Sequence, residues 1–186
     1  MPVARLCEGM LSVFIDCGPD DHKLASTLGS LVPGAVEGIV REVVLVDRGM
    51  GPDARKVADH TGCRVIAAEE LRAAVATAKG EWLLVVEPGA RLVSGWIAAV
   101  VEHVERIGEG RAVTPSAQFR RAPMDRPRFL QRLRGKRTAL ADGFLVKKPQ
   151  AIGLAGKGGA VPTLEQMVRG LAATRLEAEI RPAVRK

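Results

Sequence analysis

Three acidic residues stand directly after runs of apolar, β-prone residues, a position from which carboxylates often handle ligands. Asp16 follows residues 11–15, Asp47 follows 43–46 and Glu87 follows 83–86, and glycine or proline comes soon after each acid. In an open α/β sheet, ligands bind beyond the carboxyl ends of the strands. The spacing therefore predicts one ligand-handling edge. Two plainer alternatives stay open: Glu87 is a solvated carboxylate at a strand end, and Asp47 only caps a helix over 52–61.

The elements that must position these acids alternate along the chain. Strand patterns at 11–16, 43–47, 63–66 and 83–86 are separated by helical patterns at 22–31, 52–61 and 71–79, and a further helix is predicted over 94–106. This alternation predicts a single α/β domain with a mostly parallel sheet flanked by helices. In the last helix Ser94 is expected as the cap and His103 on the polar face without a role. The tail at 176–180 is expected to be an edge strand.

One stretch carries a resemblance to a known family. Residues 80–92, Gly-Glu-Trp-Leu-Leu-Val-Val-Glu-Pro-Gly-Ala-Arg-Leu, resemble the Gly-Glu/Asp-Trp-Leu-Leu-Phe and His-Ala-Asp-Thr-Arg-Leu motifs of short bacterial family 2 glycosyltransferases. The resemblance covers roughly 11–107 and 138–186. It implies a GT-A fold with a Rossmann-like nucleotide half at 1–93 and an acceptor half at 94–186. It also implies transfer of a sugar from a nucleotide diphosphate sugar to a hydroxyl acceptor.

The same resemblance assigns donor-binding roles. Asp47 matches the aspartate with which the family begins its Asp-Gly-Gly-Ser loop, which contacts the nucleoside. Asp16 stands in the first loop, which approaches the base, and Arg72 could supply the cation of a loop that closes over the nucleotide. Here Arg48 and Pro52 replace a glycine and an aspartate of the family's second loop. The donor-binding residues expected from the resemblance are thus Asp16, Asp47 and Arg72.

The metal and the catalytic base are the most altered parts of the family pattern. Glu87 aligns with the first acid of the Asp-X-Asp-like element that binds Mg²⁺ or Mn²⁺, while Gly89 replaces the last acid. A weak divalent metal site at Glu87 is the expectation. Residues 162–169 match the segment that holds the base, with Glu165 retained and Gln166 at the base position. Because glutamine cannot accept a proton, Glu165 is the candidate catalytic residue.

These departures leave a second hypothesis open, a catalytically inactive homologue that acts as a binding or regulatory protein. The two hypotheses predict different geometry. Convergence of Asp47, Glu87 and Glu165 on one cleft favours chemistry, whereas an ion pair of Arg48 or Arg91 that fills the edge favours binding without transfer.

Charge separates the two halves of the chain. The net charge of the chain is +7. Residues 1–93 contain 10 Lys/Arg and 13 Asp/Glu, whereas residues 94–186 contain 18 Lys/Arg and 8 Asp/Glu. Residues 120–137 hold eight Lys/Arg and one acid. They could lie on an anionic membrane surface or hold an acidic substrate, and a solvated helix is the plainer alternative.

Composition also bears on partners and location. Aromatic residues make up 3% of the chain and tyrosine is absent, which disfavours a nucleic-acid surface built on stacking. The three cysteines lack a CxxC spacing, and no secretion signal or long apolar run is present. A cytoplasmic protein is the expectation, with possible peripheral attachment at the inner face of the membrane through 120–137.

Overall fold

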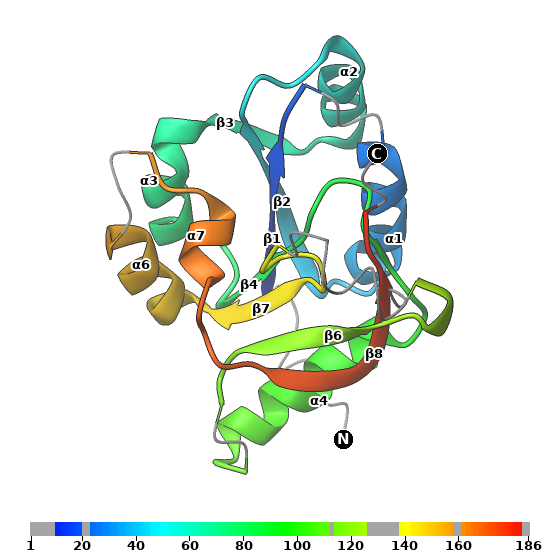
Figure 1. Cartoon of the computed structure of the whole chain (residues 1–186), viewed down its shortest axis with the longest axis vertical. Coiled ribbons are helices and arrows are strands. Elements are labelled where there is room, and N and C mark those ends of the chain that lie inside the picture. The colour runs from blue at the N-terminus through cyan, green and yellow to red at the C-terminus, as the bar shows by residue number, and fades with distance from the viewer. Residues whose placement is uncertain (1–9, 20–22, 112–113, 126–137, 158–160, 184–186) are drawn as a thin grey trace, which may run out of the picture.

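The computed structural model describes residues 10–19, 23–111, 114–125, 138–157 and 161–183, and these form one eight-stranded sheet with helices on both faces (Figure 1). The strands lie in the order β3-β2-β1-β4-β7-β6-β8-β5. Their bounds are β1 Leu11–Cys17, β2 Val40–Asp47, β3 Arg64–Ala67, β4 Trp82–Val85, β5 Arg91–Leu92, β6 Ala117–Arg121, β7 Phe144–Lys147 and β8 Thr174–Arg181.

The first half of the chain forms the parallel part of the sheet. Strands β3, β2, β1 and β4 all run parallel, as the strand–helix alternation predicts. In the second half β7 is antiparallel to β4 and β6, β8 is parallel to β6, and β5 is antiparallel to β8. The predicted α/β fold is confirmed, with a mixed sheet in its second half.

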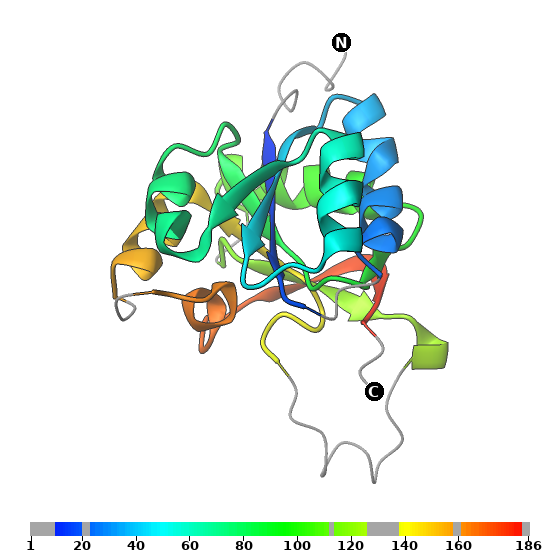
Figure 2. The same ribbon diagram turned by 90° about the horizontal axis from the view of Figure 1, so that it is seen from above.

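Helices cover the two faces of the sheet and form two cores. On one face lie α1 Leu24–Val36, α2 Pro52–Thr61 and α4 Trp96–Gly108. On the other face lie α3 Leu71–Ala76, α6 Lys148–Lys157 and α7 Leu164–Val168. Short 3-10 turns occupy Ala68–Glu70 and Pro123–Asp125. Turning the molecule shows that the sheet runs between the two groups (Figure 2).

Strand β1 divides its side chains between the two cores. Val13 and Ile15 pack toward α1 and α2, whereas Phe14 packs toward α3 and α7, and all three are fully buried. Each such side chain contributes about 1.5–3 kcal/mol of hydrophobic stabilisation. Because successive strand residues alternate between faces, burial on both sides fixes the register of β1 and the level at which it ends.

Three local predictions were wrong. His103 is buried, donating a hydrogen bond from Nε2 to the Pro115 carbonyl (3.2 Å) and packing edge-to-face on Trp82, because α4 lies against the sheet along that side. The cap of α4 is Gly95 and not Ser94. Strand β8 is not at the edge, since the two-residue β5 pairs outside it.

In the part of the chain that the structure describes, no helix combines the length and the apolar character needed to span a bilayer.

Candidate functional site at the carboxyl edge of the sheet

The strand registers bring Asp16, Asp47 and Glu87 to one edge of the sheet. Asp16 lies opposite Val46, so Asp47 follows one residue further along β2. Phe14 lies opposite Val85, so Asp16 and Glu87 each follow their paired residue by two positions. Neighbouring strands lie about 4.8 Å apart. The three acids are therefore at similar levels on adjacent strands, as the sequence predicts.

Asp47 organises the loop between β2 and α2. Its Oδ1 accepts hydrogen bonds from the backbone N–H groups of Gly49 (2.9 Å) and Met50 (2.8 Å), and its Oδ2 accepts one from Arg55 Nη2 (2.6 Å). The Met50 bond, with those of Gly49 and Arg55, holds the pKa of Asp47 below its ordinary value despite slight burial. The N-cap of α2 is Gly51. Asp47 thus shapes the loop that leads to the helix and is not itself the cap.

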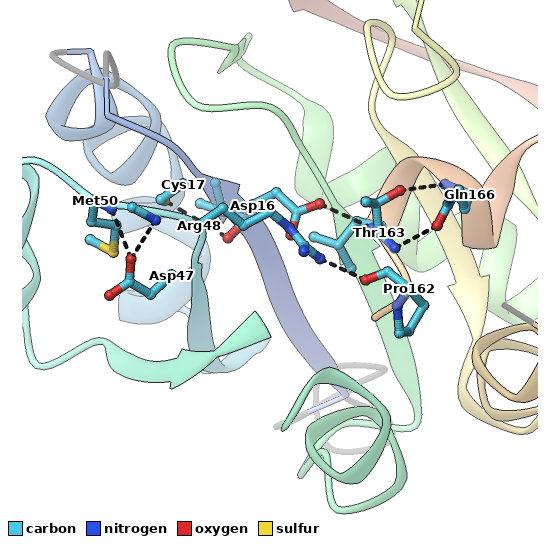
Figure 3. A network of polar contacts seen from close by, with 11 residues as sticks. Asp16, Cys17, Asp47, Arg48, Met50, Pro162, Thr163 and Gln166 are labelled. Atoms are coloured by element: carbon cyan, nitrogen blue, oxygen red, sulfur yellow. Dashed lines mark hydrogen bonds and ion pairs between the residues drawn. The ribbon is translucent and has the colours of Figure 1, made fainter. Parts of the chain in front are cut away.

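Asp16 and Arg48 bind each other and the start of α7, an arrangement that we name the Asp16–Arg48 clamp (Figure 3). Arg48 donates from Nε to Asp16 Oδ1 (2.8 Å) and from Nη2 to the carbonyl of Pro162 (2.6 Å). The backbone N–H of Leu164 donates to Asp16 Oδ2 (3.0 Å). The clamp therefore joins the ends of β1 and β2 to a segment more than one hundred residues later.

Burial sets the electrostatics of the clamp. The side chains of Arg48 and Asp16 are 23% and 21% exposed. Burial raises the pKa of Asp16 above its ordinary value, although the Arg48 guanidinium and the Leu164 N–H act in the opposite direction. Sequence analysis expected an ion pair of Arg48 if the ligand-handling edge is filled, and this ion pair is present. It lies where β1 and β2 end.

Helix α7 places the two residues of the predicted base segment differently. Thr163 caps the helix: its Oγ1 accepts from Gln166 N (3.1 Å), and Gln166 Oε1 accepts from Thr163 N (2.9 Å). This reciprocal capping box holds the Gln166 amide against the backbone. Glu165 instead points toward Arg169 one turn on, whose Nη2 donates to its Oε1 (3.0 Å). Of the two, Glu165 is the residue whose chemistry suits a general base.

Glu87 is buried at the end of β4 and accepts a hydrogen bond from the Thr138 hydroxyl. Two residues on, Gly89 has a φ of +90°, a left-handed conformation that an aspartate adopts only with strain. Within the described ranges no group of three or more His, Cys, Asp or Glu could hold a metal ion. The residues present therefore do not fit a divalent metal held by protein ligands alone.

Two further predicted features have different outcomes. Arg72 lies at the start of α3, where its Nε donates to the Ala155 carbonyl of α6 (3.0 Å), so it fastens two helices of the same layer. Its predicted role toward a nucleotide stays a prediction. Of the basic segment 120–137, residues 126–137 lie outside the described residues.

A fourth carboxylate lies at this edge, and its two arginine partners were not predicted from the sequence. Asp142 is buried before β7 and contacts two arginines, which we call the Asp142 cluster. Arg121 donates from Nε to Asp142 Oδ1, and Arg175 donates from Nη1 to Asp142 Oδ2 (3.1 Å) and to Phe119 O (2.8 Å). Arg121 belongs to the basic segment 120–137, but no pattern in the sequence pairs Arg121 or Arg175 with Asp142, which lies 21 and 33 residues away.

No family model matches the chain, and no curated protein matches it. Solved structures do. Glucosyl-3-phosphoglycerate synthase from Mycobacterium tuberculosis, in complex with Mn²⁺, uridine diphosphate and phosphoglyceric acid, is 18% identical over 80% of this chain and 58% of that chain, with a TM-score of 0.53. The same synthase with Mn²⁺, uridine diphosphate and glucosyl-3-phosphoglycerate gives 15% identity over 98% and 75%, with a TM-score of 0.58. TarS of S. aureus gives 11% identity over 94% and 37%, with a TM-score of 0.63.

At these identities the likeness is one of fold. The chain has the mixed α/β fold of GT-A glycosyltransferases. It spans less than two thirds of the first synthase structure and of TarS.

Proposed function

We propose that the protein is a GT-A-type glycosyltransferase-like protein that transfers a sugar from a nucleotide diphosphate sugar to a hydroxyl acceptor. The observation that carries the proposal is the placement of Asp47, Asp16 and Glu87 at the ends of the adjacent strands β2, β1 and β4. Ligands of open α/β sheets bind at this edge. Structures with the same fold hold uridine diphosphate or its glucose derivative, which supports a nucleotide-sugar donor.

The three acids and α7 supply the proposed roles. Asp47 holds the nucleoside, Asp16 keeps the donor edge in place through Arg48 and Leu164, Glu87 accepts hydrogen bonds from the donor sugar, and Glu165 takes the proton of the acceptor. The acceptor oxygen then forms a bond to the anomeric carbon, and the bond from that carbon to the diphosphate breaks. The nucleoside diphosphate leaves with the electron pair, and the proton stays on Glu165. No step is assigned to a metal, because Glu87 is a single carboxylate and would hold Mg²⁺ or Mn²⁺ only together with the donor diphosphate.

A second candidate function is nucleotide-sugar binding without transfer. Two observations favour it: the Asp16–Arg48 clamp occupies part of the donor edge, and the capping box engages Gln166 at the position of the family's base. Under this proposal the chain is a binding or regulatory partner that has kept the fold. The two candidates share donor binding and differ in whether the sugar is moved.

Donor binding is tested by calorimetric titration with uridine, guanosine and thymidine diphosphates and their sugars, with and without Mn²⁺. Binding of one of them is expected, and any requirement for Mn²⁺ would be carried by Glu87 together with the donor diphosphate. Glu87→Gln should weaken binding of that nucleotide sugar about tenfold, since it replaces a charged acceptor by a neutral one. Glu81→Gln is the matched control, because Glu81 is exposed at the opposite end of the same strand. Absence of binding to every donor contradicts both candidates.

Transfer is tested by release of nucleoside diphosphate from the bound donor in the presence of hydroxyl acceptors. Glu165→Gln should lower release about a hundredfold or more if Glu165 is the base. Glu102→Gln is the control, since Glu102 likewise pairs with an arginine one turn on, Arg106, on the exposed face of α4. Donor binding by a chain that releases no product favours the second candidate.

A further inference from the structure

Helix α1 presents an uncharged face to solvent at one side of the molecule (Figure 1, Figure 2). None of its 13 residues is charged. Val36 is 81% exposed and Val32 is 55% exposed, and Ala25, Gly29 and Pro33 are exposed as well. The neighbouring α2 differs, because its exposed side carries charged residues: Asp53, Arg55, Lys56 and Asp59. A helix face that meets only water is usually polar, so the outer face of α1 suits a partner.

Two of the three hydroxyl side chains of α1 are used inside the molecule. Thr27 Oγ1 accepts a hydrogen bond from the Gly89 N–H (2.8 Å). Ser30 Oγ accepts one from the Leu92 N–H (3.2 Å). These bonds fasten the inner side of α1 to the segment between β4 and β5 and to β5 itself. The exposed side keeps Ser26 as its hydroxyl and is otherwise built of apolar and small residues.

The exposed face contains a stripe whose two halves differ in size. Its members follow one another at helical spacing and therefore lie on the same side of α1: Ala25, Gly29, Val32 and Val36. The small residues come first and the valines second. A Cβ built on Gly29 meets nothing within 4 Å, so the space beside it is open. In an antiparallel pair of α1 helices, related by a two-fold axis near Ser30, the valines of each copy lie over the small residues of the other.

Opposite charges stand at the two ends of the stripe. Lys23 is the N-cap residue of α1 and Glu37 is its C-cap residue, and both are exposed. Antiparallel pairing about an axis near Ser30 brings Lys23 of each copy to Glu37 of the other, so that the same charge pair forms twice. Parallel pairing would instead set like charges against each other. The charge pattern therefore favours a second, antiparallel copy of this helix as the partner.

We propose that the outer face of α1 is the interface of a homodimer, in which the α1 helices of two copies pack antiparallel. The interface is independent of the donor edge and of the proposed function. A helix of 13 residues is about 20 Å long, so the contact between two of them is small. The dimer therefore belongs with weak interfaces, which bury less than about 1,200 Å² in total.

Sedimentation equilibrium of the full chain, from roughly 1 µM to 1 mM, tests the proposal. A monomer–dimer equilibrium is expected. Val36→Glu should raise the dissociation constant about tenfold or more, because it buries two unpaired carboxylates. Gly29→Leu should also raise it by filling the space for a valine, although leucine favours the helix. Ile152→Glu is the matched control and should leave the constant unchanged, since Ile152 is an exposed apolar residue of α6 on the other face of the sheet.

Charge reversal tests the orientation of the two helices. Lys23→Glu or Glu37→Lys alone sets like charges together and should weaken the dimer, whereas the double variant should recover the wild-type dissociation constant. A double variant that does not recover it, or an equal loss in Val36→Glu and Ile152→Glu, would overturn the antiparallel α1 interface. A chain that stays monomeric at every concentration would overturn the proposal as well. Binding to phosphatidylcholine vesicles that Val36→Glu abolishes would then assign the face to a membrane surface.

Discussion

At one edge of the sheet, the two halves of the molecule pair arginine with aspartate in two different arrangements. In the Asp16–Arg48 clamp, one guanidinium meets one carboxylate, and the second bonds of each go to backbone groups at Pro162 and Leu164. In the Asp142 cluster, two guanidiniums share one carboxylate. The clamp is an internally satisfied link between distant segments, whereas the cluster joins the strands β6 and β8 through one carboxylate. The clamp thus fastens the start of α7 to β1 and β2, and the cluster fastens β8 to β6.

Burial makes the carboxylates of the two arrangements unequal as well. Asp142 is more deeply buried than Asp16, and it anchors β6 and β8 at once. Asp16 has a raised pKa, so it can take a proton when its partner is lost. Removal of a charge from the Asp142 cluster and from the Asp16–Arg48 clamp should therefore lower the free energy of unfolding by different amounts.

The largest effect is expected for Asp142→Asn. The change removes the charge of the buried carboxylate that Arg121 and Arg175 share, and should lower the free energy of unfolding by about 3 kcal/mol. Urea unfolding followed by circular dichroism measures it. Glu177→Gln, which breaks the exposed pair with Arg120, should change the value by at most about 0.5 kcal/mol. Similar losses of unfolding free energy in both variants would mean that Asp142 contributes no more to stability than the exposed pair of Arg120 and Glu177 does.

A smaller effect is expected for Arg48→Gln. It removes the donors to Asp16 and to the Pro162 carbonyl and should cost about 2 kcal/mol. Hydrogen exchange at the Leu164 amide should quicken, because Asp16 then loses its fixed position. Arg55→Gln, which removes the exposed partner of Asp47, should leave that amide as it was. Unchanged exchange in Arg48→Gln would show that α7 does not depend on the clamp.

The sequence was sufficient for the parts of the fold that local patterns determine. Apolar runs ending in an acid predicted β1, β2 and β4, and the helix at 52–61 has the predicted bounds. Such elements depend on periodicity and turn residues that are contiguous in the chain. The same reasoning placed Asp16, Asp47 and Glu87 at one edge, because parallel strands end together.

The rest depended on contacts between distant residues. His103 was assigned to a polar face because its helix was considered alone, whereas Trp82 covers it from the sheet. The partners of Arg48 and Asp142 come from other elements, 32 to 114 residues away for Arg48 and 21 to 33 for Asp142. Side-chain pairing across such separations arises only when the sheet is assembled, and the spacing of residues in the sequence does not predict it.

The smallest effect concerns pH and compares Asp16 with Asp47, adjacent acids with opposite shifts. The raised pKa of Asp16 means that the folded state binds its proton more tightly than the unfolded state does. This tighter proton binding stabilises the folded state fully at pH values below the ordinary pKa of 3.8. The stabilisation is lost as the pH rises through the pKa of Asp16 in the folded state. The melting temperature of the wild type minus that of Asp16→Asn should therefore fall as the pH rises through this range, and should stay constant at higher pH.

Asp47 should behave in the reverse manner, because its pKa is lowered by Met50, Gly49 and Arg55. Its contribution is complete above 3.8 and is lost as pH falls through the folded pKa. The wild type relative to Asp47→Asn should then lose melting temperature on acidification. Thermal melts of the three proteins across the acid range check both signs. The same sign for both variants would mean that the clamp does not bury Asp16 in solution, and that the donor edge is more open than its bonds to Arg48 and Leu164 imply.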